Sequence, residues 1–492
     1  MIYAQIAGLI QQAIDHHLIE RADEVYARNQ ILGLLNLVSY PEQVTEQADD
    51  TIPNLVEKII TYAIDAEIIA DVFDDKEILS ANIMNCLIAR PSIINETFQR
   101  KYEQSPMDAT TYFYELSKNS NYIQMNRIRK NIHFKSETIY GDMDITINMS
   151  KPEKDPEQIK RERAIKQEIN YPKCPLCMEN EGYVGRTGYP ARANHRIIQV
   201  PLGGENWYFQ YSPYVYYNEH SILFAEKHRD MKIDQEAFAR LLTFVELYPH
   251  YFIGSNADLP IVGGSILSHD HYQAGYYEFA MTRAATDFTF ELERYTHVAA
   301  SVLEWPLAAI RLQSKDKAQL VAAAEHILGI WKNYDDEQAH IQAFTGDTPH
   351  NTITPIARMN GDLLELDLVL RNNRTNKQNP TGIFHPKRDV HHIKQENIGL
   401  IEVMGLAVLP ARLKTELAEI KQFLLQEKDD VAPYHQDWAN HMKEIYPDQL
   451  TEKQVDMIIE KELGKKFTRV LEDADVFKDK DASKRFINTL NK

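Results

Sequence analysis

The sequence predicts an α+β protein. Residues 1–120 carry apolar side chains at the three- and four-residue spacing of amphipathic helices. From about Tyr171 onward, segments rich in aromatic and branched residues favour strands. Helical and strand patterns are mixed without the strict alternation that builds a parallel sheet, so a purely α/β fold is not expected.

Each expected element follows from local patterning. Apolar residues recur at helical spacing over 2–18, and similar spacing continues through 54–73 and 76–88. Residues 150–169 are charged and contain two prolines, which mark a break before a further helix. The later patterns predict strands over 207–217, 221–225 and 363–370, and a strand region over 259–273 that is broken at Gly263-Gly264. Helices are predicted over 234–247, 317–333, 413–424 and in the charged tail to 492.

Length and composition limit the classes of function. A chain of 492 residues suggests two or three domains, because single cores stop growing below that size. The formal charge of −18 argues against a nucleic-acid surface, so cations that bind phosphate must be local. Three cysteines provide no disulfide framework. With no signal-peptide pattern and no apolar run near the ~18 residues of a membrane span, we expect a soluble, cytoplasmic protein without a membrane partner.

The strongest local signal is the pair Cys174 and Cys177, separated by Pro-Leu. Two thiolates at this spacing can bind one metal ion, and zinc is the favoured metal. A redox pair is one alternative, but the strand and helix of a thioredoxin-like unit are missing around it. An unligated structural pair is the other. Because no second cysteine pair follows, the remaining ligands must be histidine or carboxylate.

A second signal is a segment that follows a Gly-Gly pair and contains His269, His271 and Gln273. On a strand, residues two apart point to the same face, so both imidazoles and the amide would share one surface. The glycines let backbone N–H groups approach a phosphate closely. Such a surface suits metal binding or attack on phosphorus, although an edge strand can also carry these residues without a function.

These motifs resemble those of the galactose-1-phosphate uridylyltransferase family, in its divergent second bacterial branch, the UTP–hexose-1-phosphate uridylyltransferases. The resemblance spans nearly the whole chain, and the stretches that fit are 174–195, 206–228, 252–273 and 391–413. The better-known branch carries His-Pro-His-Gly-Gln followed by an apolar residue and Trp. This chain has Asp270 and Tyr272 instead of the proline and the glycine, so details of nucleotide packing do not carry over.

The resemblance implies two related halves of the histidine-triad superfamily, with mixed or antiparallel sheets, and a homodimer. We therefore expect four parts along the chain. They are a helical N-terminal region (1–120), a first half with the zinc site and the nucleophile (121–290), a second half (291–430) and a helical C-terminal tail (431–492).

The catalytic and metal residues follow from the match to the family's motifs. The second histidine of the motif is the family's nucleophile, which implies His271, and the glutamine is its phosphate partner, which implies Gln273. The resemblance further implies one structural zinc ion per chain. Its ligands would be Cys174, Cys177, His228 and His269.

The match for the other substrate contacts is looser. Asn194 resembles an asparagine on the uridine side, and His195 stands where the family has an acid. Asn256 and Ser265 can equally be turn-forming and capping residues. The candidates ahead of the motif and beyond it are Asn256, Gly264 and Ser265 for phosphate and Glu402 for a hexose hydroxyl. Glu402 can equally be a solvated helix residue.

A basic stretch resembles one that reaches the substrate phosphate in the family, and Arg127 and Lys154 are its candidates. The alternative for both residues is a solvated face. Some family members carry a second metal site with His-x-His in the later half. The matching stretch here, 365–370, has no histidine, so we expect no second metal site.

The resemblance thus predicts an enzyme that exchanges UMP between UDP-glucose and galactose 1-phosphate, giving glucose 1-phosphate and UDP-galactose. A covalent uridylyl-histidine would be the intermediate, since a neutral imidazole with a pKa near ~6.5 is available as a nucleophile at neutral pH. A histidine-triad hydrolase or phosphorylase would release the same intermediate to water or phosphate. A structural zinc module is the non-enzymatic alternative, and the basic stripe expected of a nucleic-acid binder is missing.

Overall fold

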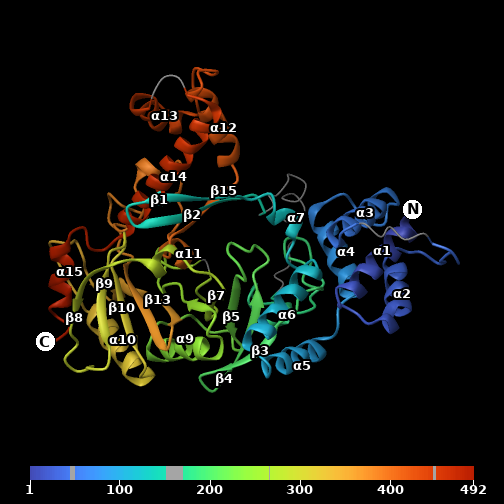
Figure 1. Ribbon diagram of the computed structural model, residues 1–492, viewed down its shortest axis with the longest axis horizontal. Coiled ribbons are helices and arrows are strands. Elements are labelled where there is room, and N and C mark those ends of the chain that lie inside the picture. The colour runs from blue at the N-terminus through green and yellow to red at the C-terminus, as the bar shows by residue number, and fades with distance from the viewer. Residues whose placement is uncertain (45–49, 151–169, 265, 447–449) are drawn as a thin grey trace. The chain divides into compact units, whose positions relative to one another are not determined.

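The computed structural model describes residues 1–44, 50–150, 170–264, 266–446 and 450–492 (Figure 1). It confirms the predicted α+β class, and the chain forms two compact units. Unit 1 comprises residues 1–130, 150–215 and 219–228, and unit 2 comprises residues 131–149, 216–218 and 229–492. None of the helices in the described ranges combines the length and the apolar character that a membrane-spanning helix needs.

Unit 1 combines a helical region with three antiparallel strands (Figure 1). The helices are α1 (Ile2–Asp15), α2 (Glu24–Leu34), α3 (Ile52–Asp65), α4 (Phe73–Asn85), α5 (Pro91–Tyr102), α6 (Pro106–Asn119) and the short α7 (Met125–Ile128). Proline in the first turn starts α3, α5 and α6, where its missing N–H leaves no bond unmade. The strands β3 (Ile198–Leu202), β4 (Glu205–Tyr211) and β5 (Ser221–Ala225) pair in that order.

An aromatic cluster joins the helices of unit 1 to these strands. Phe113 of α6 is fully buried, and its ring lies 6.2 Å from that of Phe98 on α5. On the strand side, the same ring lies 5.7 Å from Phe209 and 5.3 Å from Tyr211. Burial of such rings is among the largest apolar contributions to a core. Helices α5 and α6 therefore share one core with the strands of unit 1.

Unit 2 contains a small mixed sheet and a larger antiparallel one. In the small sheet, β1 (Ile132–Thr138) and β2 (Gly141–Asn148) are antiparallel, and β15 (Leu406–Pro410) joins β2 in parallel. A two-stranded hairpin, β11 (Phe344–Thr345) and β12 (Thr348–Pro349), lies apart from both. The strands of the larger sheet in unit 2 are, in spatial order, β7 (His271–Gly275), β6 (Phe252–Gly254), β13 (Asn351–Asn360), β14 (Leu363–Asn372), β10 (Ala309–Ser314), β9 (Ala299–Leu303) and β8 (Thr286–Phe290).

Helices cover the larger sheet and extend the C-terminal part of unit 2. The helices α9 (Gln235–Leu247) and α10 (Lys317–Trp331) pack against each other and against β13 and β14 (Figure 1). The short α11 (Leu400–Val403) and the long α14 (Glu452–Ala474) contribute to a core that includes Ile145, Ile356 and Val369 of the strands. The remaining helices are α12 (Leu413–Leu424), α13 (Pro433–Ile445) and α15 (Lys480–Ile487).

The sequence-based elements agree with most of this, with three corrections. The expected helix over 54–73 ends at Asp65, and residues 66–72 form a turn and a loop before α4. The expected strand over 259–273 is wrong in its first part, because β7 begins only at His271 and the described residues before it form turns and loops. The backbone turns sharply there: Ile261 has a φ of 74°, and a Cβ on Gly263 would lie 2.2 Å from the carbonyl oxygen of Ala257. The expected strand over 207–217 ends at Tyr211. The helix expected within 150–169 lies outside the described residues.

Candidate active site and metal centre

The residues predicted as zinc ligands form one group. Each of Cys174, Cys177, His228 and His269 offers a ligand atom, and these atoms all lie within 4.8 Å of one another. The two sulfur atoms are 3.5 Å apart. Two thiols and two imidazoles match the donor set of a closed, four-coordinate structural zinc site, so these residues fit a metal ion.

A side chain that the sequence did not single out holds the cysteine loop. Asn180 is 1% exposed, and its amide donates to the carbonyl oxygens of Cys174 at 2.8 Å and Cys177 at 2.7 Å. The hydroxyl of Tyr189 donates in turn to the Asn180 side-chain oxygen at 2.9 Å. The backbone N–H of Cys177 also donates to the carbonyl of Cys174. These bonds fix the turn that brings the two thiols together.

His271 is the first residue of β7, and its ring is anchored through one nitrogen. Its Nδ1 lies 2.8 Å from the carbonyl oxygen of His269. A carbonyl only accepts, so Nδ1 carries the proton and donates, which leaves the lone pair on Nε2. Burial lowers the pKa of His271 to about 4, so the imidazole is neutral at pH 7. The chemistry available at Nε2 is that of a neutral nucleophile.

Gln273 lies two residues farther along β7, opposite Gly254 of β6. Its side-chain oxygen is buried and has no hydrogen-bond partner in the described part of the chain. An amide without a partner for its oxygen is free to reorient toward a ligand, because no internal bond holds it. The alternation of a strand places Gln273 on the same face as His271.

Asn256, Gly264 and Glu402 converge on one turn of unit 2. Asn256 accepts the backbone N–H of Leu400 at 2.9 Å, and the carboxylate of Glu402 accepts that of Gly399 at 3.2 Å. A Cβ on Gly264 would lie 2.9 Å from the Asn256 amide nitrogen, so the close approach favours glycine. These predicted substrate residues therefore share one place in the fold.

Two buried cations that the sequence did not reveal support the same turn. Lys394 is 6% exposed and donates to the Glu402 carboxylate at 3.0 Å. Arg371 on β14 is 1% exposed and donates to the carbonyl oxygen of Ile398 at 2.9 Å. Burial lowers the pKa of Arg371 to about 10, which still leaves the guanidinium charged at pH 7. No spacing signal marks either residue, because Lys394 lies in a loop eight positions before Glu402 and Arg371 lies 27 positions before Ile398.

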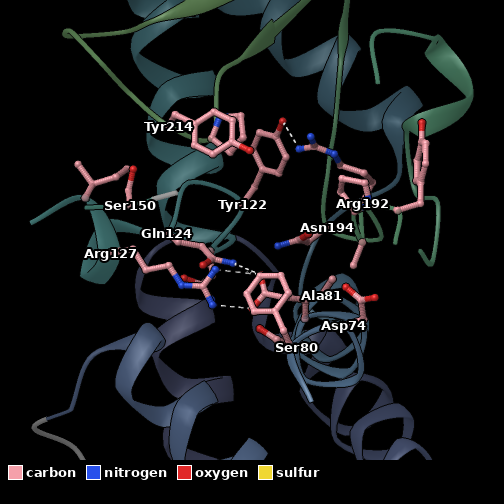
Figure 2. A pocket seen from close by; sticks show the side chains of 18 of the residues that line it. Asp74, Ser80, Ala81, Tyr122, Gln124, Arg127, Ser150, Arg192, Asn194 and Tyr214 are labelled. Atoms are coloured by element: carbon pink, nitrogen blue, oxygen red, sulfur yellow. Dashed lines mark hydrogen bonds and ion pairs between the residues drawn. The ribbon is translucent and has the colours of Figure 1, made fainter. Parts of the chain in front are cut away.

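A cavity of about 290 Å³ in unit 1 brings Asn194 and Arg127 together (Figure 2). The amide of Asn194 donates to the carbonyl oxygen of Ser120 at 3.0 Å. Arg127 donates to both oxygens of Glu77, at 2.6 and 3.1 Å, as the dashed lines in Figure 2 show. The predicted basic residue is thus part of an ion pair at the wall of this cavity.

Aromatic side chains form another wall of the cavity (Figure 2). Arg192 donates to the hydroxyl of Tyr122 at 2.7 Å, and the Tyr122 ring stacks on His195 with centroids 4.5 Å apart. His195 is buried with Nε2 2.9 Å from the Gln210 side-chain oxygen, and burial lowers its pKa well below the usual value. His195 is therefore neutral and supports Tyr122.

Two further predictions concern other parts of the chain. Lys154 and Ser265 lie outside the described residues. In the stretch where some family members bind a second metal, Asp367 is fully buried and accepts from Arg311 at 2.7 Å and from Arg358 at 2.8 Å. Arg358 also bonds Glu365. These carboxylates are thus engaged by guanidinium groups, and the expected lack of a second metal stays a prediction.

The sequence matches two domain models of one family. The model described as "Galactose-1-phosphate uridyl transferase, N-terminal domain" matches residues 17–230, and the corresponding C-terminal domain matches residues 244–440. Proteins named galactose-1-phosphate uridylyltransferase from Clostridium acetobutylicum and Halalkalibacterium halodurans are 47% and 49% identical. The first match covers 100% of both chains, and the second covers 100% of this chain and 99% of the relative.

A protein of the same name from Fusobacterium nucleatum is 47% identical over 99% of this chain and 98% of its own. Among solved structures, a DUF4931 family protein from Bacillus cereus aligns with a TM-score of 0.26 and 12% identity, over 36% of this chain and 86% of that one. The sequence matches define a nucleotidyltransferase enzyme. The chain belongs to the galactose-1-phosphate uridylyltransferase family.

Proposed function

We propose that this enzyme exchanges UMP between UDP-glucose and galactose 1-phosphate through a covalent uridylyl group on His271. The products are glucose 1-phosphate and UDP-galactose. The observation that carries the proposal is the anchored imidazole of His271, whose Nδ1–H bonds the His269 carbonyl at 2.8 Å. This bond orients the ring and leaves the Nε2 lone pair for attack on phosphorus.

The reaction then consists of two matched displacements. The Nε2 lone pair attacks the α-phosphorus of UDP-glucose, an N–P bond forms, and the P–O bond to glucose 1-phosphate breaks. The leaving phosphate takes the bonding electron pair, so this step needs no proton donor. A phosphate oxygen of galactose 1-phosphate next attacks the same phosphorus, and the N–P bond breaks to restore neutral His271. The amide of Gln273 is suited to hold a non-bridging oxygen as charge redistributes.

Zinc would be held by Cys174, Cys177, His228 and His269, whose ligand atoms lie together. A four-coordinate shell of protein ligands leaves no position for water or substrate, so its role would be structural. The lone pair of a metal-bound imidazole is donated to the metal, so it cannot attack phosphorus. The metal assignment therefore separates the roles of the two histidines, with His269 as ligand and His271 as nucleophile.

The substrate contacts are proposed in two groups, each argued within its own unit. In unit 1, Asn194 and Arg127 line the cavity of about 290 Å³ (Figure 2). Its aromatic walls suit a nucleoside, and Arg127 is the candidate contact for a substrate phosphate. In unit 2, Asn256, Gly264 and Glu402 meet at one turn, where the polar side chains of Asn256 and Glu402 suit a sugar phosphate and the glycine allows a close approach of the backbone. A homodimer, a cytoplasmic location and phosphate contacts from Lys154 belong to the same proposal.

Steady-state kinetics test the exchange mechanism. Varying UDP-glucose at several fixed concentrations of galactose 1-phosphate should give parallel double-reciprocal lines, as expected for a substituted-enzyme intermediate. Labelled glucose 1-phosphate should also exchange into UDP-glucose without galactose 1-phosphate. Intersecting lines together with no partial exchange would contradict the proposal. Release of UMP to water at a rate equal to turnover would favour a histidine-triad hydrolase.

A further inference from the structure

The strand that carries His271 is held from behind by a buried polar cluster. Tyr272 follows His271 on β7, so its side chain points to the opposite face of the strand. Tyr272 is 1% exposed, and the neighbouring Asp270 is 3% exposed. Polar groups at such depth need partners, because burying them unpaired is costly.

Arg240 of helix α9 reaches the residues on both sides of His271. Its Nη1 donates to the Tyr272 hydroxyl at 2.9 Å and lies 3.9 Å from the Asp270 carboxylate. Arg240 is itself buried, with 7% of the residue exposed. Its other terminal nitrogen pairs at 3.0 Å with Glu236, one turn earlier on α9, whose side chain is 79% exposed.

Arg229 provides a second attachment for Asp270. Its Nε donates to the Asp270 carboxylate at 3.2 Å, and its carbonyl oxygen accepts the Asp270 backbone N–H at 2.7 Å. Asp270 is thus fixed both through its backbone and through its side chain. Asp270 and Tyr272 are therefore held by Arg229 and Arg240, and His271 lies between them in the sequence.

We propose that Arg240 is a positioning residue for uridylyl transfer, which acts through Tyr272 and Asp270 to fix the backbone that presents His271. The inference rests on the proposed function of His271. A displacement at phosphorus needs the nucleophile within a narrow distance and direction, and a misplacement near 1 Å can cost about 100-fold in rate. In this chain, Asp270 and Tyr272 stand where the better-known motif has proline and glycine. Their polar side chains are the groups that Arg240 of α9 contacts.

The test is the single-turnover rate at which labelled UDP-glucose uridylylates His271. In Tyr272→Phe and Arg240→Met, assayed well below the Tm of each variant, we expect this rate to fall by about 10- to 100-fold, with unchanged KM for UDP-glucose and unchanged zinc content. The Tm of Arg240→Met should fall as well, because Asp270 and Tyr272 lose a buried partner. Arg240→Lys keeps the charge and should recover part of the rate. Glu236→Ala removes only the exposed partner of Arg240 and is the matched control, with a rate equal to that of the unmodified enzyme.

The possible results distinguish the positioning role of Arg240 from the proposed function of His271. If the unmodified enzyme labels His271 and Tyr272→Phe labels it equally fast, the positioning role is overturned and the proposed function stands. A rate in Tyr272→Phe that falls only in step with zinc content or Tm would reduce the cluster to a structural role and also overturn it. If Arg240→Met does not fold, Tyr272→Phe and Arg240→Lys decide. An unmodified enzyme that never carries label would overturn the proposed function itself.

Discussion

Replacing Asn180 by alanine should weaken zinc binding without touching a metal ligand. The substitution removes the amide bonds to the carbonyls of Cys174 at 2.8 Å and Cys177 at 2.7 Å. Each bond contributes roughly 0.5–1.5 kcal/mol, so the turn loses about 1–3 kcal/mol of preorganisation. Because about 1.4 kcal/mol is a factor of ten, zinc affinity should fall roughly 5- to 150-fold. Outer residues of other metal sites contribute by similar factors.

The assay is competition for zinc between the enzyme and a chromogenic chelator at fixed pH. Asn206→Ala is the matched control, because Asn206 is exposed and its amide contacts the two carboxylate oxygens of Glu226 at a long distance of 3.4 Å. The control should keep the affinity of the unmodified enzyme. Equal affinities for Asn180→Ala and the unmodified enzyme would refute the view that Asn180 prearranges the cysteine loop.

Three further outcomes follow from the structure. Arg358→Met leaves the buried carboxylates of Glu365 and Asp367 with one guanidinium fewer, so the free energy of unfolding should fall by about 3–5 kcal/mol. Thermal unfolding that matches the unmodified enzyme would count against this. Asn194→Ala should raise the KM for UDP-glucose roughly 2- to 10-fold through one lost hydrogen bond, measured by initial rates, and an unchanged KM would remove Asn194 from the site. Arg127→Ala should raise the KM for hexose 1-phosphate about tenfold if the guanidinium contacts the phosphate, whereas unchanged kinetics would confine it to the pair with Glu77.

The metal site could be predicted from the sequence, because the residue type and spacing of its two cysteines by themselves indicate metal binding. Cys174 and Cys177 stand at metal-binding spacing, and the resemblance supplied His228 and His269 as their partners. The structure brings all four ligand atoms within 4.8 Å. Cysteine and histidine are rare enough in such patterns that their type alone carries information.

The supporting residues could not be predicted, because their roles depend on long-range contacts. Arg240 meets Tyr272 across 32 positions, and Arg371 reaches the carbonyl of Ile398 across 27. In a sequence, an arginine on an amphipathic helix or at a strand end predicts exposure. Only the packing of α9 against the sheet turns Arg240 inward.

The misassigned strand has a different physical cause. The run Leu259, Ile261 and Val262 has the branched, apolar composition of a strand. In the structure, the left-handed Ile261 and the close approach of Gly263 to the Ala257 carbonyl bend the chain into a loop instead. Composition favoured a strand, but the glycine permitted a tighter path than any strand allows.

The most direct test of the account is the identity of the residue that carries the uridylyl group. Enzyme is mixed with uridine-labelled UDP-glucose without acceptor, digested under basic conditions because the N–P bond is labile to acid, and the labelled peptide is mapped. The account predicts label on His271, and none in His271→Ala, a variant that still binds zinc through Cys174, Cys177, His228 and His269. Label on His269, or turnover that proceeds with no labelled histidine, would contradict it.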